Sequence, residues 1–203
     1  MNPEMGEIHI DQTITLGNEG KEISVLLLKE EIGHGLIGMI TSKLFPGNVA
    51  LVAVTGSPED TDFNIGYHGH SRDGKSERIG LDEKLIDGLR TKSDESLFVL
   101  LHELGHLVNK DVVAVGEDFE RYNQTRIEKV KSGEVMEMEL RADSFAVEYL
   151  GIQASINGLH ALMDREKAYY LSDTFIREEV EIALAETGYR IQYLESIQFQ
   201  DKS

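Results

Sequence analysis

Residues 93–110 read SDESLFVLLHELGHLVNK and are the most informative part of the sequence. It begins with Ser93, a favourable residue for a helix N-cap, and continues with acidic residues that suit a first helical turn. Apolar residues then recur as far as Val108, and the helix is expected to end near Asn109-Lys110. The sequence therefore predicts a mostly buried helix across this stretch.

The predicted helix carries the motif HELGH at 102–106. His102 and His106 are four residues apart and share one helix face, so two imidazole nitrogens can bind one zinc ion at about 2.1 Å. Glu103 is placed to take a proton from a metal-bound water. The alternative is a pair of hydrogen-bonded core histidines. It leaves Glu103 unexplained, and unsatisfied buried imidazoles are costly.

A catalytic zinc ion takes three protein ligands, and residues 134–150, EVMEMELRADSFAVEYL, are the stretch that offers the third. Glu139 and Asp143 are four residues apart on one face of a predicted second helix. Ala142 and Ala146 are small enough to let this helix pack closely against the first.

Two other carboxylates compete for the third-ligand position. Glu137 lies about 200° around the helix from Glu139, and Glu134 is also off that line. A solvated acidic face is the alternative interpretation of Glu139 and Asp143. The preceding HELGH motif favours the metal-binding interpretation.

HELGH followed by ELRADSFA at 139–146 resembles the gluzincin zinc peptidases, and is most similar to the ImmA/IrrE-type peptidases. The resemblance covers about 93–151 and implies an α+β, zincin-like metallopeptidase fold with a small N-terminal β-sheet and a mostly helical C-terminal half. It implies that Glu139 is the third zinc ligand. It also implies that Asp143 hydrogen-bonds the remaining ring nitrogen of His102 and fixes its tautomer.

The function expected from these residues is zinc-dependent hydrolysis of peptide bonds. Zn²⁺ held by His102, His106 and Glu139 would activate water, and Glu103 would act as the general base. The alternative is a regulatory or partner-binding protein on a metallopeptidase scaffold with little or no proteolytic activity. Gluzincins commonly add a His or Tyr that stabilises the oxyanion. Spacing does not choose among the available residues, which are His160, Tyr149, Tyr169, Tyr170, His68 and His70.

Composition narrows the class of protein. The chain has 203 residues, 40% of them hydrophobic, which predicts a single domain over 1–203, strand-rich to about 92 and helical from about 93. There are no cysteines, so metal ligands must be nitrogen and oxygen atoms. The net charge of −17 disfavours binding to nucleic acid or membranes. The peptidase resemblance implies that the substrate is a protein or peptide. The sequence shows no signal peptide or membrane span, which predicts a cytoplasmic protein. The sequence does not predict the oligomeric state.

Other elements follow from periodicity and turn residues. Strands are predicted at 23–28, 49–55 and 63–70. The peptidase resemblance implies that 63–70 is a substrate-binding edge strand beside the zinc helix. Helices are predicted at 30–45, 81–90, 152–171 and 173–198. The polar segment 117–131 is expected to be a surface helix or a mobile cover near the cleft.

Overall fold

The computed structural model describes residues 9–18, 21–32, 35–45, 47–53, 66–70, 77–111, 117–170 and 177–200. Within these ranges, only the backbone is described at 66–70, 117–119, 169–170, 177 and 200. The chain forms two compact units, Met1–Lys92 and Ser93–Ser203. The prediction of a single domain stays a prediction.

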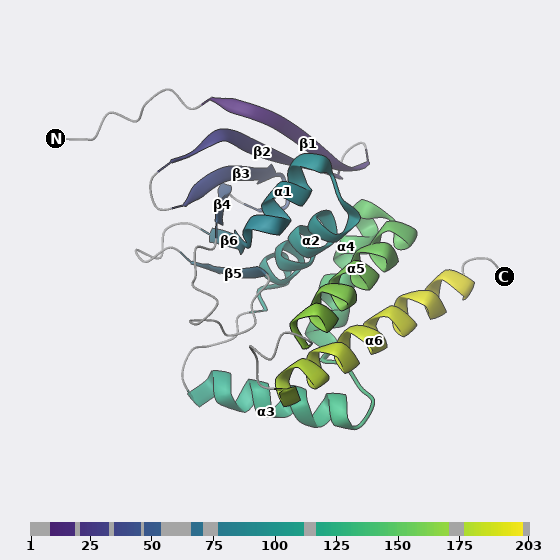
Figure 1. Ribbon diagram of the computed structural model, residues 1–203. Helices are drawn as coiled ribbons and strands as arrows, with labels where there is room; N and C mark the ends of the chain where they lie inside the picture. The colour runs from purple at the N-terminus through teal and green to yellow at the C-terminus, as the bar shows by residue number, and fades with distance from the viewer. Residues whose placement is uncertain are drawn as a thin grey trace. The chain divides into compact units, whose positions relative to one another are not determined.

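The first unit is built on a six-stranded sheet with the order β1-β2-β3-β4-β6-β5 (Figure 1). All neighbouring strands are antiparallel except β4 and β6, which run parallel. The strands are β1 (Ile10–Asn18), β2 (Lys21–Ile32), β3 (Leu36–Ser42), β4 (Asn48–Ala53), β5 (Gly66–His70) and β6 (Glu77–Leu81).

The predicted helix at 30–45 is wrong. Residues up to Ile32 continue β2, and β3 follows after Gly35, whose φ of 79° suits a glycine in the turn. Ile40 of β3 is fully buried and pairs with both β2 and β4. A Cβ at Gly38 would lie 2.6 Å from the Leu26 carbonyl oxygen, so this glycine permits close approach of the neighbouring strand.

Helix α1 (Glu83–Thr91) follows β6 directly and agrees with the predicted short helix at 81–90. The Asp82 side chain caps it by accepting a hydrogen bond of 2.7 Å from the Leu85 backbone N–H. At its other end, Arg90 donates to the Asp11 carboxylate of β1 and to the Leu28 carbonyl of β2. These contacts hold the helix against the sheet.

The second unit is helical and contains α2 (Asp94–Asn109), α3 (Glu117–Lys131), α4 (Glu137–Leu150), α5 (Ile152–Tyr170) and α6 (Arg177–Gln200). Helix α2 contacts α4 and α5, and α5 in turn contacts α6. The apolar face predicted for α2 is buried, with Phe98, Leu100, Leu101 and Leu104 at most 1% exposed. The predicted α+β class, with a β-sheet followed by a helical half, is confirmed.

The other predicted helices lie where they were expected, with ends displaced by a few residues. The polar segment 117–131 is helical as α3, and α5 and α6 occupy the two predicted C-terminal helical segments. Strand β5 forms one edge of the sheet and covers residues 66–70 of the strand predicted at 63–70; residues 63–65 lie outside the described ranges. Its position beside the zinc helix stays a prediction.

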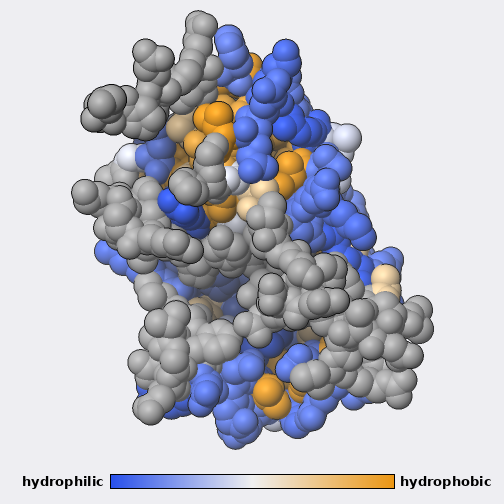
Figure 2. Space-filling model, turned by 60° about the vertical axis from the view of Figure 1, so that its left-hand side comes forward, coloured by the Kyte–Doolittle hydropathy of each residue, from blue (hydrophilic) through white to orange (hydrophobic). Residues whose placement is uncertain are grey.

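Figure 2 shows a face on which the described surface is largely hydrophilic, as expected for a chain with 37 acidic and 20 basic residues. The exposed large hydrophobic side chains in the described ranges are Ile10, Ile32, Leu44, Tyr193 and Phe199. None of the helices in those ranges combines the length and apolar character needed to cross a bilayer.

Candidate metal centre

Helix α2 places the two histidines of HELGH side by side. The Ser93 hydroxyl caps the helix by accepting a hydrogen bond from the Ser96 N–H, and four-residue spacing puts His102 and His106 on the same face. Both side chains are buried, with residue exposures of 7% and 5%. Their Nε2 atoms are 3.0 Å apart, and the two rings meet edge to face at an interplanar angle of 88°.

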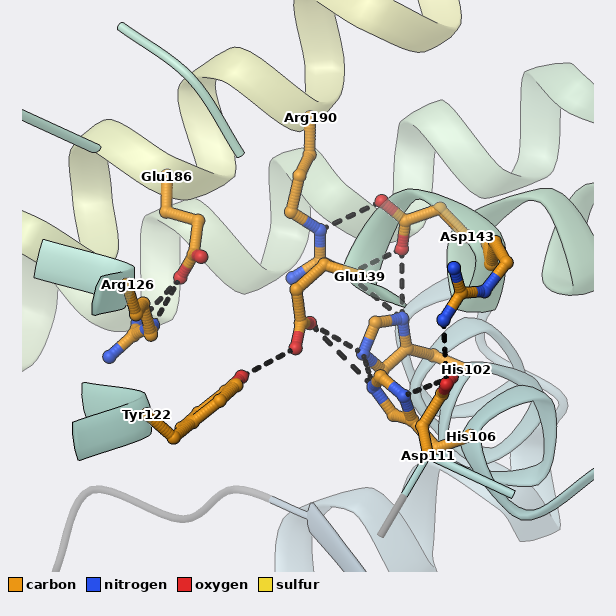
Figure 3. Close-up of polar contacts among 10 residues, drawn as sticks. His102, His106, Asp111, Tyr122, Arg126, Glu139, Asp143, Glu186 and Arg190 are labelled. Atoms are coloured by element: carbon orange, nitrogen blue, oxygen red, sulfur yellow. Dashed lines mark hydrogen bonds and ion pairs between the residues drawn. The ribbon is translucent and has the colours of Figure 1, made fainter. Parts of the chain in front are cut away.

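Helix α4 brings Glu139 to the same point (Figure 3). Its Oε2 atom lies 3.1 Å from Nε2 of His102 and 3.7 Å from Nε2 of His106. Glu139 is in the first turn of α4, where the helix dipole favours a negative charge. Helices α2 and α4 approach closely because Gly105 of α2 faces Ala142 of α4, and both residues are small. A Cβ on Gly105 would lie 2.9 Å from the Ala142 Cα.

These three side chains fit a divalent metal ion. Among the described residues they form the group that can hold one, with one ligand atom from each and all three atoms within 4.8 Å of one another. Tetrahedral ligands at about 2.1 Å from zinc are about 3.4 Å apart. The observed separations of 3.0, 3.1 and 3.7 Å bracket that value. Two imidazoles and one carboxylate are also the donor types of a catalytic zinc site.

The other ring nitrogen of His102 faces a buried ion pair. Nδ1 lies 2.8 Å from Oδ1 of Asp143, which is fully buried. Arg190 of α6 donates to both oxygens of Asp143 and lies over the Phe98 ring. Burial raises the pKa of Asp143, but the contacts of Arg190 and His102 together outweigh it and hold that pKa below its usual value. The short contact is compatible with the predicted role of Asp143, in which an ionised carboxylate accepts the Nδ1 hydrogen of His102 and the Nε2 lone pair is left for a metal.

His106 has a similar outer contact through a different element. Its Nδ1 lies 3.3 Å from Oδ2 of Asp111, and the other oxygen of Asp111 accepts a 2.8 Å hydrogen bond from Arg141 of α4. Helix α2 ends at Asn109, and Lys110 adopts a left-handed conformation with φ 58°. The chain thereby turns back, and Asp111 comes to lie beside the last helical turn.

The remaining oxygen of Glu139 contacts helix α3. The Tyr122 hydroxyl donates a 3.1 Å hydrogen bond to Oε1 of Glu139. Burial, together with the neighbouring charge of Glu139, raises the pKa of Tyr122 far above its usual value, so the phenol is protonated and acts as a donor. Arg126, one turn further along α3, donates through Nε and Nη2 to Oε2 of Glu186 on α6.

Contacts within the cluster shift the pKa values of His102 and Glu139 in opposite directions. Burial and Arg190 lower the pKa of His102, but its hydrogen bonds to Asp143 and Glu139 outweigh them and raise the pKa to about 9. Burial raises the pKa of Glu139, while its contacts with both histidines bring it well below the usual value. A carboxylate facing two imidazoles therefore attracts a positive charge, which a metal ion supplies in place of the proton.

Among the other predicted site residues, the structure describes the side chains of Glu103, His160 and Tyr149. Glu103 is half-buried on α2, next to His102, as its place in the motif requires. His160 is exposed on α5, and Tyr149 is a buried residue of α4 that packs against Phe145. The side chains of the other predicted oxyanion candidates, Tyr169, Tyr170, His68 and His70, lie outside the described residues.

The rival carboxylates for the third-ligand position point elsewhere. The Glu137 side chain is 87% exposed and pairs with Arg141, and the Glu134 side chain is 63% exposed and pairs with Lys129. Of these three glutamates, Glu139 is the one whose carboxylate faces the Nε2 atoms of the histidines. The assignment of His102, His106 and Glu139 as ligands, of Glu103 as base and of Asp143 as the partner of His102 stays a prediction.

Three residues in contact with the cluster were not predicted from the sequence: Asp111, Tyr122 and Arg190. Asp111 carried a local signal, since it follows directly on the expected end of the zinc helix. Tyr122 and Arg190 had no such signal, because they come from helices whose contacts with α4 depend on tertiary packing. Arg190 lies 88 residues from His102 along the chain.

A family model matches the chain over residues 38–170, and its description is peptidase family M48. No curated protein and no solved structure matches the chain. The matched span begins in β3, ends with α5 and includes all three residues that face one another in the metal centre. The match covers well over half of the chain, which therefore belongs to peptidase family M48, a family of metallopeptidases.

Proposed function

We propose that this protein is a zinc-dependent endopeptidase whose metal ligands are His102, His106 and Glu139. The observation that carries the proposal is the convergence of two Nε2 atoms and one carboxylate oxygen at the spacing of a tetrahedral site. Three protein ligands leave a coordination position for water, as in catalytic rather than structural zinc sites. Within the peptidases, the segment ELRADSFA supports a likeness to the ImmA/IrrE type.

Each residue of the cluster has a defined task in this proposal. A zinc ion in the site would supply Lewis-acid chemistry, which polarises the scissile carbonyl and acidifies water. Glu103 accepts the proton of the attacking water at its carboxylate and then delivers it to the leaving amine. Asp143, held by Arg190, keeps the hydrogen of His102 on Nδ1. The substrate is a protein or peptide.

The test compares Glu103→Gln with Glu137→Gln. The first removes the proposed base, and the second removes an exposed carboxylate of α4 that faces away from the histidines. Both variants should retain one zinc ion per chain by elemental analysis. Hydrolysis of a proteome-derived peptide library should be lost in Glu103→Gln alone, by a factor of at least about 10²–10⁴. Full activity of Glu103→Gln would remove Glu103 as the base.

The same measurements separate a peptidase from a regulatory protein on the same scaffold. Wild-type protein that binds zinc but cleaves no peptide would favour the regulatory function. If the wild-type protein binds no zinc and has the same metal content as Glu139→Gln, that result would contradict the metal site itself.

A further inference from the structure

Glu139 divides its two oxygens between two different partners. Oε2 faces both histidines, at 3.1 and 3.7 Å from their Nε2 atoms, while Oε1 accepts the hydrogen bond of Tyr122 at 3.1 Å. The Glu139 side chain is only 13% exposed, so water has little access to either oxygen. The Tyr122 hydroxyl therefore takes the place of solvent at Oε1, and Figure 3 shows it approaching from the side opposite the histidines.

The position of Tyr122 is fixed by contacts made further along α3. Arg126 is half-buried and makes two hydrogen bonds of 2.8 and 2.6 Å to the same oxygen of Glu186, a residue that is 5% exposed. Val130, one turn further on, is 2% exposed. The pair of Arg126 with Glu186 joins α3 to α6 on the face that carries Tyr122, since Tyr122, Arg126 and Val130 follow one another at four-residue spacing.

We propose that Tyr122 is a positioning residue that restricts Glu139 to binding the metal through Oε2 alone. A carboxylate binds a metal through one oxygen or through both. Because Tyr122 occupies Oε1 with a hydrogen bond, the second oxygen is directed away from the ion and the remaining coordination position is left for water. The inference rests on the proposed function, since it requires Glu139 to be a ligand.

Removal of the hydroxyl would leave Oε1 buried without its donor, which is unfavourable for a charged oxygen. The nearest source of compensating charge is the metal ion, so a small rotation of the carboxylate would bring both oxygens onto it. The ion would then have one more protein ligand and would polarise water less effectively. The expected change is therefore in the number of coordinated atoms, with the metal retained.

The experiment compares wild-type protein, Tyr122→Phe and Tyr193→Phe after zinc is replaced by Co²⁺, whose visible absorption reports coordination geometry. Tyr193 of α6 is 37% exposed, so its substitution removes the same hydroxyl from a ring near solvent. Wild-type protein and Tyr193→Phe should show the intense visible bands of four-coordinate cobalt. Tyr122→Phe should bind one Co²⁺ per chain, show the weaker bands of a five-coordinate ion, and lose activity by about 10–100-fold.

The outcomes separate this inference from the proposed function. A Tyr122→Phe spectrum that superimposes on that of the wild type overturns the positioning role, and does so even where activity falls, because the hydroxyl would then act on the substrate. Loss of cobalt binding in Tyr122→Phe, with the fold intact by circular dichroism, also overturns it. If the wild-type protein binds no cobalt and has the same cobalt content as Glu139→Gln, the metal site of the proposed function is refuted.

Discussion

Gly105→Ala tests whether the crossing of α2 and α4 sets the metal geometry. An added Cβ would lie 2.9 Å from the Ala142 Cα and 3.1 Å from the Phe145 Cβ, whereas ordinary contacts of a Cβ begin at 3.4 Å. The helices must therefore separate by about 0.5 Å (3.4 − 2.9 Å) for the methyl group to fit. Glu139 lies one turn before Ala142 on the same helix, and it should move away from the histidines with α4.

The size of the effect can be worked out from this displacement. Overpacking costs about 1–3 kcal/mol, and replacement of a helical glycine by alanine contributes about 1 kcal/mol in the opposite direction. The net loss in the free energy of unfolding is about 0–2 kcal/mol, which lowers Tm by up to about 8 °C for a chain of this size. Because a misplacement of 1 Å costs about 10²-fold in catalysis, a displacement of half that size should lower kcat about tenfold.

Gly158→Ala is the matched control. Its Cβ would lie 2.6 Å from the Phe98 Cβ, so it overpacks the contact of α5 with α2 rather than the crossing of α2 with α4. Thermal unfolding, zinc affinity in competition with a chelator, and peptide hydrolysis should be measured for both variants. Both should lose stability, and only Gly105→Ala should lose zinc affinity and activity. Equal losses of zinc affinity in the two variants, or none in Gly105→Ala, would refute the reasoning.

Three further predictions concern the buried charges of the helical unit. Asp143→Asn removes the negative charge that pairs with Arg190 and that accepts the hydrogen bond of His102. Zinc affinity, measured by zinc titration, should fall about 10–100-fold. The free energy of unfolding, measured by urea denaturation, should fall by about 3–5 kcal/mol. Unchanged affinity with lowered stability would restrict Asp143 to a role in folding. The pKa of His102 is raised to about 9, so a proton competes with zinc below that pH. Zinc affinity, corrected for binding of zinc by the buffer, should rise about tenfold per pH unit between pH 7 and pH 9. A zinc affinity that does not change with pH would contradict competition between the proton and zinc. Burial raises the pKa of Glu166 from 4.5 to about 7, so the folded state retains a proton that the unfolded state loses over that range. The resulting destabilisation is absent below pH 4.5 and complete above about 7, where it reaches about 3 kcal/mol. Urea denaturation should show a lower free energy of unfolding at pH 8 than at pH 5 in the wild type, and a smaller difference in Glu166→Gln. Equal differences in the two proteins would mean that other groups cause the loss of stability.

The helical unit was largely predictable because its signals are local. The N-cap at Ser93, the apolar pattern of α2 and the four-residue spacing of the histidines each specify helix without reference to the rest of the chain. The pairing of Glu139 with Asp143 at the same spacing, on a helix with small residues, was enough to indicate the partner helix. These features combine in one short span, and that span lies within the family match.

The sheet and the outer contacts of the site were less predictable, because they depend on residues far apart in the sequence. Residues 36–42 have apolar spacing that is compatible with a helix, and they form β3 because β2 and β4 provide hydrogen bonds on both sides. Tyr122 comes from a helix expected to be no more than a polar surface segment or cover. Arg190 lies on α6, beyond the end of the family match, and a lone arginine in an amphipathic pattern carries no local sign of an Asp143 partner.

The hydrogen bonds of Arg190 to Asp143 also bear on the order in which the protein is made. A ribosome releases α2 and α4 well before α6, and the aspartate and arginine are separated by 47 residues. Until the last helix has emerged, Asp143 lacks its guanidinium partner, and the imidazole beside it lacks a firmly held acceptor. The proposed metal centre would therefore gain its firmly held acceptor for His102 only once translation has passed α6.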